Sequence, residues 1–177
     1  MHQEFLDHGA RVFGLSSDSP EQNAAVMEKL ALTFPILSDP ERDRAITPLG
    51  FADENDPRLI SRPGVVILAP GGEEVWRHTG RDYADRPHED ILLAEVSKLD
   101  LSPTTQGLPV IGEAVPGEKA MPIEGLPPYL RGAKFAVLAL RGRHRSLDDE
   151  FKDDTKVYVQ RVERYLEALS GVEERRA

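Results

Sequence analysis

The chain of 177 residues has 40% hydrophobic and 30% charged residues, which is typical of one globular domain with at most one appendage. Its formal net charge of -9 argues against binding to nucleic acid or to an anionic membrane, because both need a cationic surface. The sequence contains no cysteine, which excludes disulfides, thiolate metal sites and any reaction of a cysteine nucleophile within this chain.

No stretch has the length and apolar character of a membrane-spanning helix. The first twelve residues are polar and acidic and have no apolar signal core. We therefore expect a cytoplasmic protein with no membrane partner.

The first two elements are a short helix and a short strand. Phe5 and Leu6 form the apolar face of a helix over residues 2–9, and Gly9 stands where a left-handed C-terminal cap belongs. The apolar run over residues 11–16 ends in polar turn residues, which predicts a buried strand.

A second helix begins after a capping motif. Ser19 is the predicted N-cap, Pro20 occupies the first helical position and Gln22 completes a capping box. Val26 and Leu30 are expected to form its inner face.

An extended segment and a third helix are predicted next. Residues 33–37 favour an edge strand because they contain a proline. Asp39 and Pro40 predict the start of a helix that ends near Thr47, which precedes another proline. Residues 50–59 read as a polar loop.

Residues 60–75 predict a β-hairpin. The apolar run 65–68 forms its first strand, residues 69–72 form the turn, and Val75 lies on the return strand. Pro63 at the mouth of the first strand is unusual because it removes a backbone donor, and Arg62 places a permanent cation there.

A helix beginning at Pro87 follows the hairpin, and its predicted inner face consists of Ile91, Leu92, Val96 and Leu99. Helices that alternate with strands predict an α/β sheet with right-handed crossovers, to which the hairpin adds an antiparallel edge.

The second half of the chain has a different composition. Residues 100–128 are rich in proline and glycine and predict a linker, or an arm laid over the domain. Residues 129–170 predict a helical hairpin, with Ser146 as the cap of its second helix. The apolar stripe of that second helix consists of Phe151, Thr155, Tyr158, Val162, Tyr165 and Leu169.

Three segments carry a resemblance to a known family. Residues 9–20 (GARVFGLSSDSP), residues 34–40 (FPILSDP) and residues 62–72 resemble the peroxiredoxins of the alkyl hydroperoxide reductase/thiol-specific antioxidant (AhpC/TSA) family. The resemblance covers residues 1–99 and implies a partial thioredoxin-like fold and thiol-dependent peroxide reduction. It also implies that Arg62 is the arginine that positions peroxide and stabilises the thiolate, and that Pro63 is a cis proline.

The chain departs from that family in one decisive respect. The family's cysteine-bearing segment would precede residue 1, which implies a shifted start, a fragment or a genuine loss. Arg62 and Pro63 would then be remnant positions of a catalytic site that is not intact, because an arginine can position and stabilise but cannot act as a nucleophile. Three hypotheses follow: a peroxiredoxin-like oxidoreductase, a non-catalytic thioredoxin-fold interaction module, and a truncated gene product. The resemblance further implies a homo-oligomer or a thioredoxin-like partner.

Other candidate sites have ordinary structural explanations. Arg62 could instead pair with Asp53, Glu54 or Asp56, although we favour the placement implied by the family. Ser16, Ser17 and Ser19 lack the elbow motif of a serine nucleophile, and helix capping explains Ser19.

Histidines and a basic run offer two further candidates. A metal site of His78 and His88 with Asp82, Asp85, Glu89 and Asp90 is conceivable, but a solvated loop is the preferred interpretation. His2, His8 and His144 are expected to be isolated and exposed. The run Arg141, Arg143, His144 and Arg145 could bind a phosphate, although a complement to a helix dipole is preferred. No pattern predicts a cofactor or a metal.

Overall fold

The structure is a computed structural model that describes residues 1–58, 60–144 and 148–176. The chain divides into two compact units, Met1–Gly117 and Glu118–Ala177, which are described separately. Among the described residues, no helix is long and apolar enough to cross a membrane.

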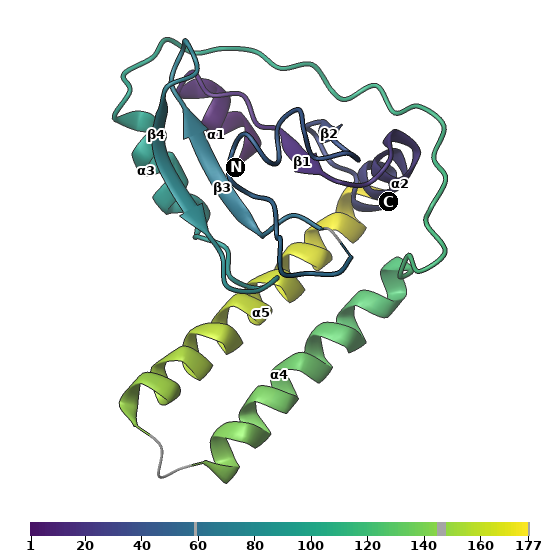
Figure 1. Ribbon diagram of the computed structural model, residues 1–177, viewed down its shortest axis with the longest axis vertical. Helices are drawn as coiled ribbons and strands as arrows, with labels where there is room; N and C mark the ends of the chain where they lie inside the picture. Colours follow the sequence, from purple (N-terminus) through teal and green to yellow (C-terminus); the bar gives the residue numbers. More distant parts are fainter. Residues whose placement is uncertain (59, 145–147, 177) are drawn as a thin grey trace. The chain divides into compact units, whose positions relative to one another are not determined.

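The first unit contains all the strands that the structure describes (Figure 1). Its elements alternate between helix and strand before a hairpin and a final helix, as the sequence predicts. They are α1 His2–Asp7, β1 Gly14–Ser16, α2 Pro20–Leu30, β2 Ile36–Ser38, β3 Gly64–Leu68, β4 Glu74–Thr79 and α3 Glu89–Ser97.

The strands form two small sheets, so the expectation of one continuous sheet is wrong. β1 pairs with β2 in parallel, with Leu15 opposite Leu37, and β3 pairs with β4 in antiparallel fashion. No ladder of the described residues joins the two pairs. None of the strand residues is fully buried, so each sheet retains a partly accessible surface.

Helix α2 begins as predicted. The Ser19 side chain accepts a hydrogen bond from the backbone N–H of Gln22, and the Gln22 side chain accepts one from the backbone N–H of Ser19. The predicted inner face is wrong in detail, because Asn23, Ala24 and Met27 are buried whereas Val26 and Leu30 are half-buried.

Residues 40–50 form a series of turns, so the expected helix after Asp39 is wrong. The buried Asp39 carboxylate accepts hydrogen bonds from the backbone N–H groups of Arg44, Ala45 and Ile46. Arg42 has a φ of 61°, in the left-handed region that interrupts a right-handed helix. These bonds fold the chain back and bury Ile46 completely.

The β3–β4 hairpin agrees with the prediction. Ile67 lies opposite Trp76, and an irregularity between Ile67 and Leu68 shifts the register before the turn. Gly71 and Gly72 have φ values of 108° and 91°, which only glycine adopts readily.

Helix α3 has its N-cap at His88, whose side chain accepts a hydrogen bond from the backbone N–H of Asp90. Its expected apolar face is only partly correct. Val96 is buried, but Ile91 is 48% exposed.

The segment after α3 lies along the first unit without regular secondary structure. Gln106 is its main attachment, because its side-chain amide donates to the Val12 carbonyl at 2.7 Å and accepts from the Val12 N–H at 2.9 Å. The His2 ring lies 3.2 Å from the same Gln106 oxygen and 2.8 Å from the Thr33 hydroxyl, so the expectation of an isolated His2 is wrong. Further along, the Val115 N–H donates to the Glu21 carbonyl.

The second unit is a helical hairpin, as predicted. It contains the short 3-10 helix η1 Ile123–Gly125, α4 Leu126–Arg143 and α5 Asp149–Arg176, and α4 packs against α5 (Figure 1). Lys134 of α4 and Glu163 of α5 form an ion pair at 2.5 Å. Within the predicted stripe of α5, Thr155 and Val162 are buried. The predicted cap Ser146 and the basic residue Arg145 lie outside the described residues.

Candidate functional site

The Arg62–Pro63 corner is held by the backbone on both sides. The N–H of Arg62 donates to the Phe51 carbonyl at 2.7 Å, and the Pro63 carbonyl accepts from the N–H of Gly80 at 2.6 Å. No peptide bond among the described residues is cis, so the expectation of a cis Pro63 is wrong. A trans Pro63 leads the chain directly into the ladder in which Gly64 faces Thr79.

Two glycines allow the backbones to approach closely at this corner. A Cβ on Gly64 would lie 2.3 Å from the ring of the buried Phe51 and 2.7 Å from the His78 carbonyl. A Cβ on Gly80 would lie 2.4 Å from the Asp85 carbonyl. Both positions therefore require glycine, since real Cβ atoms do not come this close to other atoms.

The Arg62 side chain is exposed, and its guanidinium forms no ion pair with the rest of the described chain. Of the acidic residues that were alternatives as partners, Asp56 pairs with Arg58 at 2.6 Å. The Arg58 guanidinium, which donates to this carboxylate, lowers the pKa of Asp56 to about 2. The local salt bridge therefore belongs to Arg58 and leaves the Arg62 cation at the mouth of β3.

His78 and Asp85 meet beside the same corner. His78 Nε2 lies 3.4 Å from Asp85 Oδ1, and Asp85 is only 5% exposed. Asp85 also accepts a hydrogen bond from the Arg81 backbone N–H at 2.9 Å, and the His78 ring stacks on Trp76 at 6.4 Å. The interpretation of these residues as a solvated loop is therefore wrong for this pair.

The other members of the acidic and histidine cluster lie elsewhere. His88 contacts its own neighbours Glu89 and Asp90 at the start of α3. Within residues 1–58, 60–144 and 148–176, no three such side chains are grouped in a way that could hold a metal ion. An imidazole beside a buried carboxylate can accept and return a proton in general, but it does not supply a thiolate.

The serines have structural roles, as expected. Ser19 Oγ donates to Glu21 and caps α2, while Ser16 Oγ donates to Asp18 at 2.7 Å. Sequence analysis grouped His78 and Asp85 in a conceivable metal site but preferred a solvated loop, so it did not predict that Asp85 is buried beside His78.

The family comparison covers the residues of this corner. The model of the AhpC/TSA family matches residues 1–73, a range that includes Arg62, Pro63 and β3. The match covers less than half of the chain. Together with the mixed helix and strand content it supports a peroxiredoxin-like protein of the thioredoxin-like α/β class that is similar to the AhpC/TSA family over these residues.

Two proteins of Mycobacterium tuberculosis that are named as peroxiredoxins are similar to this chain. One is from strain CDC 1551 / Oshkosh and the other from strain ATCC 25618 / H37Rv, and each is 45% identical over 40 residues. The match covers 23% of this chain and 26% of each relative. The similarity therefore spans about a quarter of the length of these relatives.

Proposed function

We propose that the Met1–Gly117 unit is a peroxiredoxin-like module that does not reduce peroxides itself and acts through contacts with other protein subunits. One observation carries this proposal: the chain has no cysteine, whereas Arg62 stands at the mouth of β3 without an ionic partner among the described residues. Peroxide reduction of the family type requires a thiolate, which neither the arginine nor the His78–Asp85 pair can replace.

The strands support a role in association. Four large apolar side chains on or beside them are between 41% and 52% exposed, namely Phe13, Leu37, Leu68 and Val75. Apolar groups next to unpaired strand edges favour pairing with another chain. We propose that a second copy of the chain covers this surface, and a thioredoxin-like partner is the alternative occupant.

Peroxide consumption by the purified protein tests the first part of the proposal. With dithiothreitol or a thioredoxin system as reductant, we expect no hydrogen peroxide consumption above the protein-free rate. Turnover that persists in highly purified protein and disappears in R62A would contradict the proposal.

Sedimentation velocity over a range of concentrations tests the second part. We expect a dimer that dissociates on dilution and is weakened in F13S. V110S is a matched control, because Val110 is 95% exposed on the segment after α3 and lies outside the strands. A wild-type chain that stays monomeric at all concentrations would contradict self-association.

The proposal also includes a location in the cytoplasm without a nucleic-acid partner. The acidic charge of -9 and the lack of disulfide-forming residues support it. Fractionation of cells that express the tagged chain is the corresponding test.

A further inference from the structure

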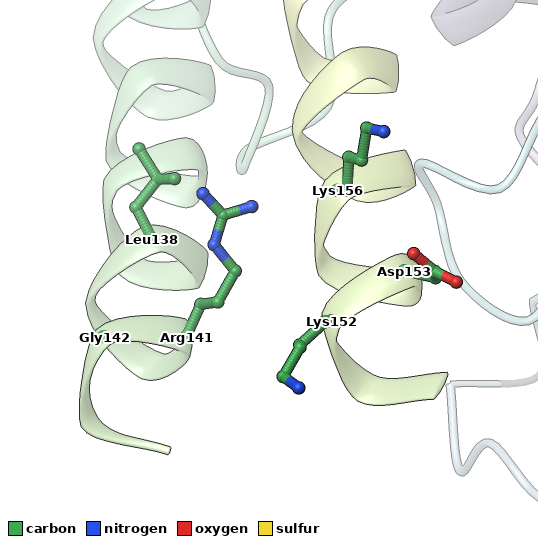
Figure 2. Close-up of a pocket in the computed structure, with 6 residues that line it drawn as sticks. All are labelled: Leu138, Arg141, Gly142, Lys152, Asp153 and Lys156. Carbon is green, nitrogen blue, oxygen red and sulfur yellow. The ribbon is translucent and has the colours of Figure 1, made fainter. Parts of the chain in front are cut away.

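The helical hairpin contains a groove of about 570 Å³, and three of its six lining residues are basic. We call it the cationic groove, and its lining residues are Leu138, Arg141, Gly142, Lys152, Asp153 and Lys156. Figure 2 shows Arg141 extending from α4 toward α5 and Asp153 pointing away from α4. The carboxylate of the groove is thus directed away from α4, whereas Lys152 of α5 extends toward α4 (Figure 2).

The register of the hairpin determines which charged residues of α4 and α5 stand at the same level. Lys134 on α4 and Glu163 on α5 form an ion pair across the two antiparallel helices. Moving seven residues along each helix toward the connecting loop, about two turns, leads from Lys134 to Arg141 and from Glu163 to Lys156. The hairpin therefore has a cation and an anion at the level of Lys134 and Glu163. About two turns closer to the connecting loop, it has a cation on both helices.

The cations of the groove are only partly neutralised by the protein. Lys152 pairs with Asp149 at 2.8 Å. Arg141 is half-buried, and neither Arg141 nor Lys156 has an ion pair or a side-chain hydrogen bond with any described residue. Like charges that line one groove repel each other, and an anion bound in the groove would reduce that repulsion.

The two units also differ in net charge, and the unit that contains the groove is the less acidic one. Residues 1–117 contain 10 Lys and Arg against 20 Asp and Glu, whereas residues 118–177 contain 12 against 11. The strong acidity of the chain is thus confined to the first unit, and the hairpin does not repel an anion through its net charge.

We propose that the cationic groove binds a phosphate group through the Arg141 guanidinium and the Lys156 ammonium. A guanidinium can bind two phosphate oxygens through its planar fork, and an ammonium supplies a second charge to the dianion. Gly142 leaves room for the ligand, because no heavy atom lies within 4 Å of the position that its Cβ would occupy. Leu138 offers an apolar contact to a group attached to the phosphate.

Calorimetric titration of the full chain tests the proposal, with inorganic phosphate and glycerol 3-phosphate as the two probes at constant ionic strength. We expect a dissociation constant on the order of 1 mM for the better probe. Tighter binding of inorganic phosphate identifies the free ion as the ligand, and tighter binding of the ester identifies a phosphate on a larger molecule. In R141Q and K156Q the affinity should fall at least about tenfold, whereas R143Q should bind normally because Arg143 does not line the groove.

The charge-reversal variant K156E separates ligand binding from a general loss of structure. It places a carboxylate opposite Arg141, as Glu163 is opposite Lys134, so it should raise the unfolding temperature by about 1–3 °C in phosphate-free buffer and abolish phosphate binding. Far-UV circular dichroism confirms that each variant keeps its helices.

Three results would overturn the proposal. They are no heat of binding with either probe, unchanged phosphate affinity in the R141Q/K156Q double variant, and tighter binding of an acidic peptide such as oligoglutamate than of both phosphate probes.

Discussion

The carboxylate of Asp39 accepts hydrogen bonds from three consecutive backbone N–H groups and is only 2% exposed. Burial by itself would raise the pKa of Asp39, but the hydrogen bonds from Ile46, Ala45 and Arg44 and the charge of Arg44 outweigh it, so the pKa lies below its ordinary value. A carboxyl group whose pKa is lower in the folded state stabilises the fold above its unfolded-state pKa, and this contribution is lost as the pH falls.

We therefore predict that D39N lowers the unfolding temperature by several degrees at pH 7, because an amide N–H₂ would face a backbone donor. The loss should become smaller in acid, because the contribution of Asp39 to the stability of the wild-type chain is lost as the pH falls from the unfolded-state pKa toward the lower folded-state pKa. Urea unfolding at pH 7 and pH 3 measures both effects. The exposed pair of Asp56 and Arg58 is present in both proteins, so its acid titration cancels in the comparison. An equal destabilisation by D39N at both pH values would contradict this account.

The Arg62–Pro63 corner depends on Gly64. We predict that G64A destabilises the protein by about 2–3 kcal/mol, because the new Cβ would overlap the Phe51 ring and the His78 carbonyl. The guanidinium carbon of Arg77 lies over the Phe51 ring, 4.7 Å from its centre, so the ring has little freedom to move. The denaturant midpoint measures the loss, and an unchanged midpoint would show that Phe51 can relax.

At the level of the elements, helix α4 contains a glycine that, unlike Gly64, has room for a side chain. Gly132 lies within this helix, and a Cβ there would have no heavy atom within 4 Å. We predict that G132A stabilises the protein by about 0.5–1 kcal/mol, because alanine has the higher helix propensity and reduces the freedom of the unfolded chain. Thermal unfolding followed at 222 nm is the measurement. Destabilisation by G132A would mean that α4 needs the glycine for a contact.

The elements also show where local sequence signals suffice. Ser19, Pro20 and Gln22 specify the start of α2 because the capping bonds lie within one turn. Asp39 and Pro40 present a similar signal, but the Asp39 carboxylate is bonded to N–H groups five to seven residues further along. The same pair of residue types can therefore start a helix or close a wider turn, and the burial of Ile46 favours the turn here.

At the scale of the first unit, the segment after α3 acts as a strap. Gln106 bonds both backbone groups of Val12, much as a neighbouring strand would. We predict that Q106A leaves the helix content unchanged and increases hydrogen exchange and proteolytic cleavage within residues 100–117, because these contacts hold the strap. Mass spectrometry after limited proteolysis locates the cuts. The matched control is E113Q, a charge change on the same segment, which should cleave like the wild type.

Sequence reasoning reached the class of the fold, the β3–β4 hairpin and the helical hairpin. Each of these depends on signals that are close in the sequence, such as caps, turn glycines and the period of the apolar residues, or on motifs that the AhpC/TSA family shares. The lack of cysteine, with its consequence for thiol chemistry, also needs no structure.

Only the tertiary structure decided how distant segments combine. It separated the strands into two sheets, brought His78 to the buried Asp85, attached Gln106 to Val12 and placed Arg141 and Lys156 along one groove. These outcomes depend on packing, burial and register between segments that no local pattern encodes. The free energy and the pKa of a polar side chain depend on whether it is in water or buried beside a charge, which the sequence near it does not specify.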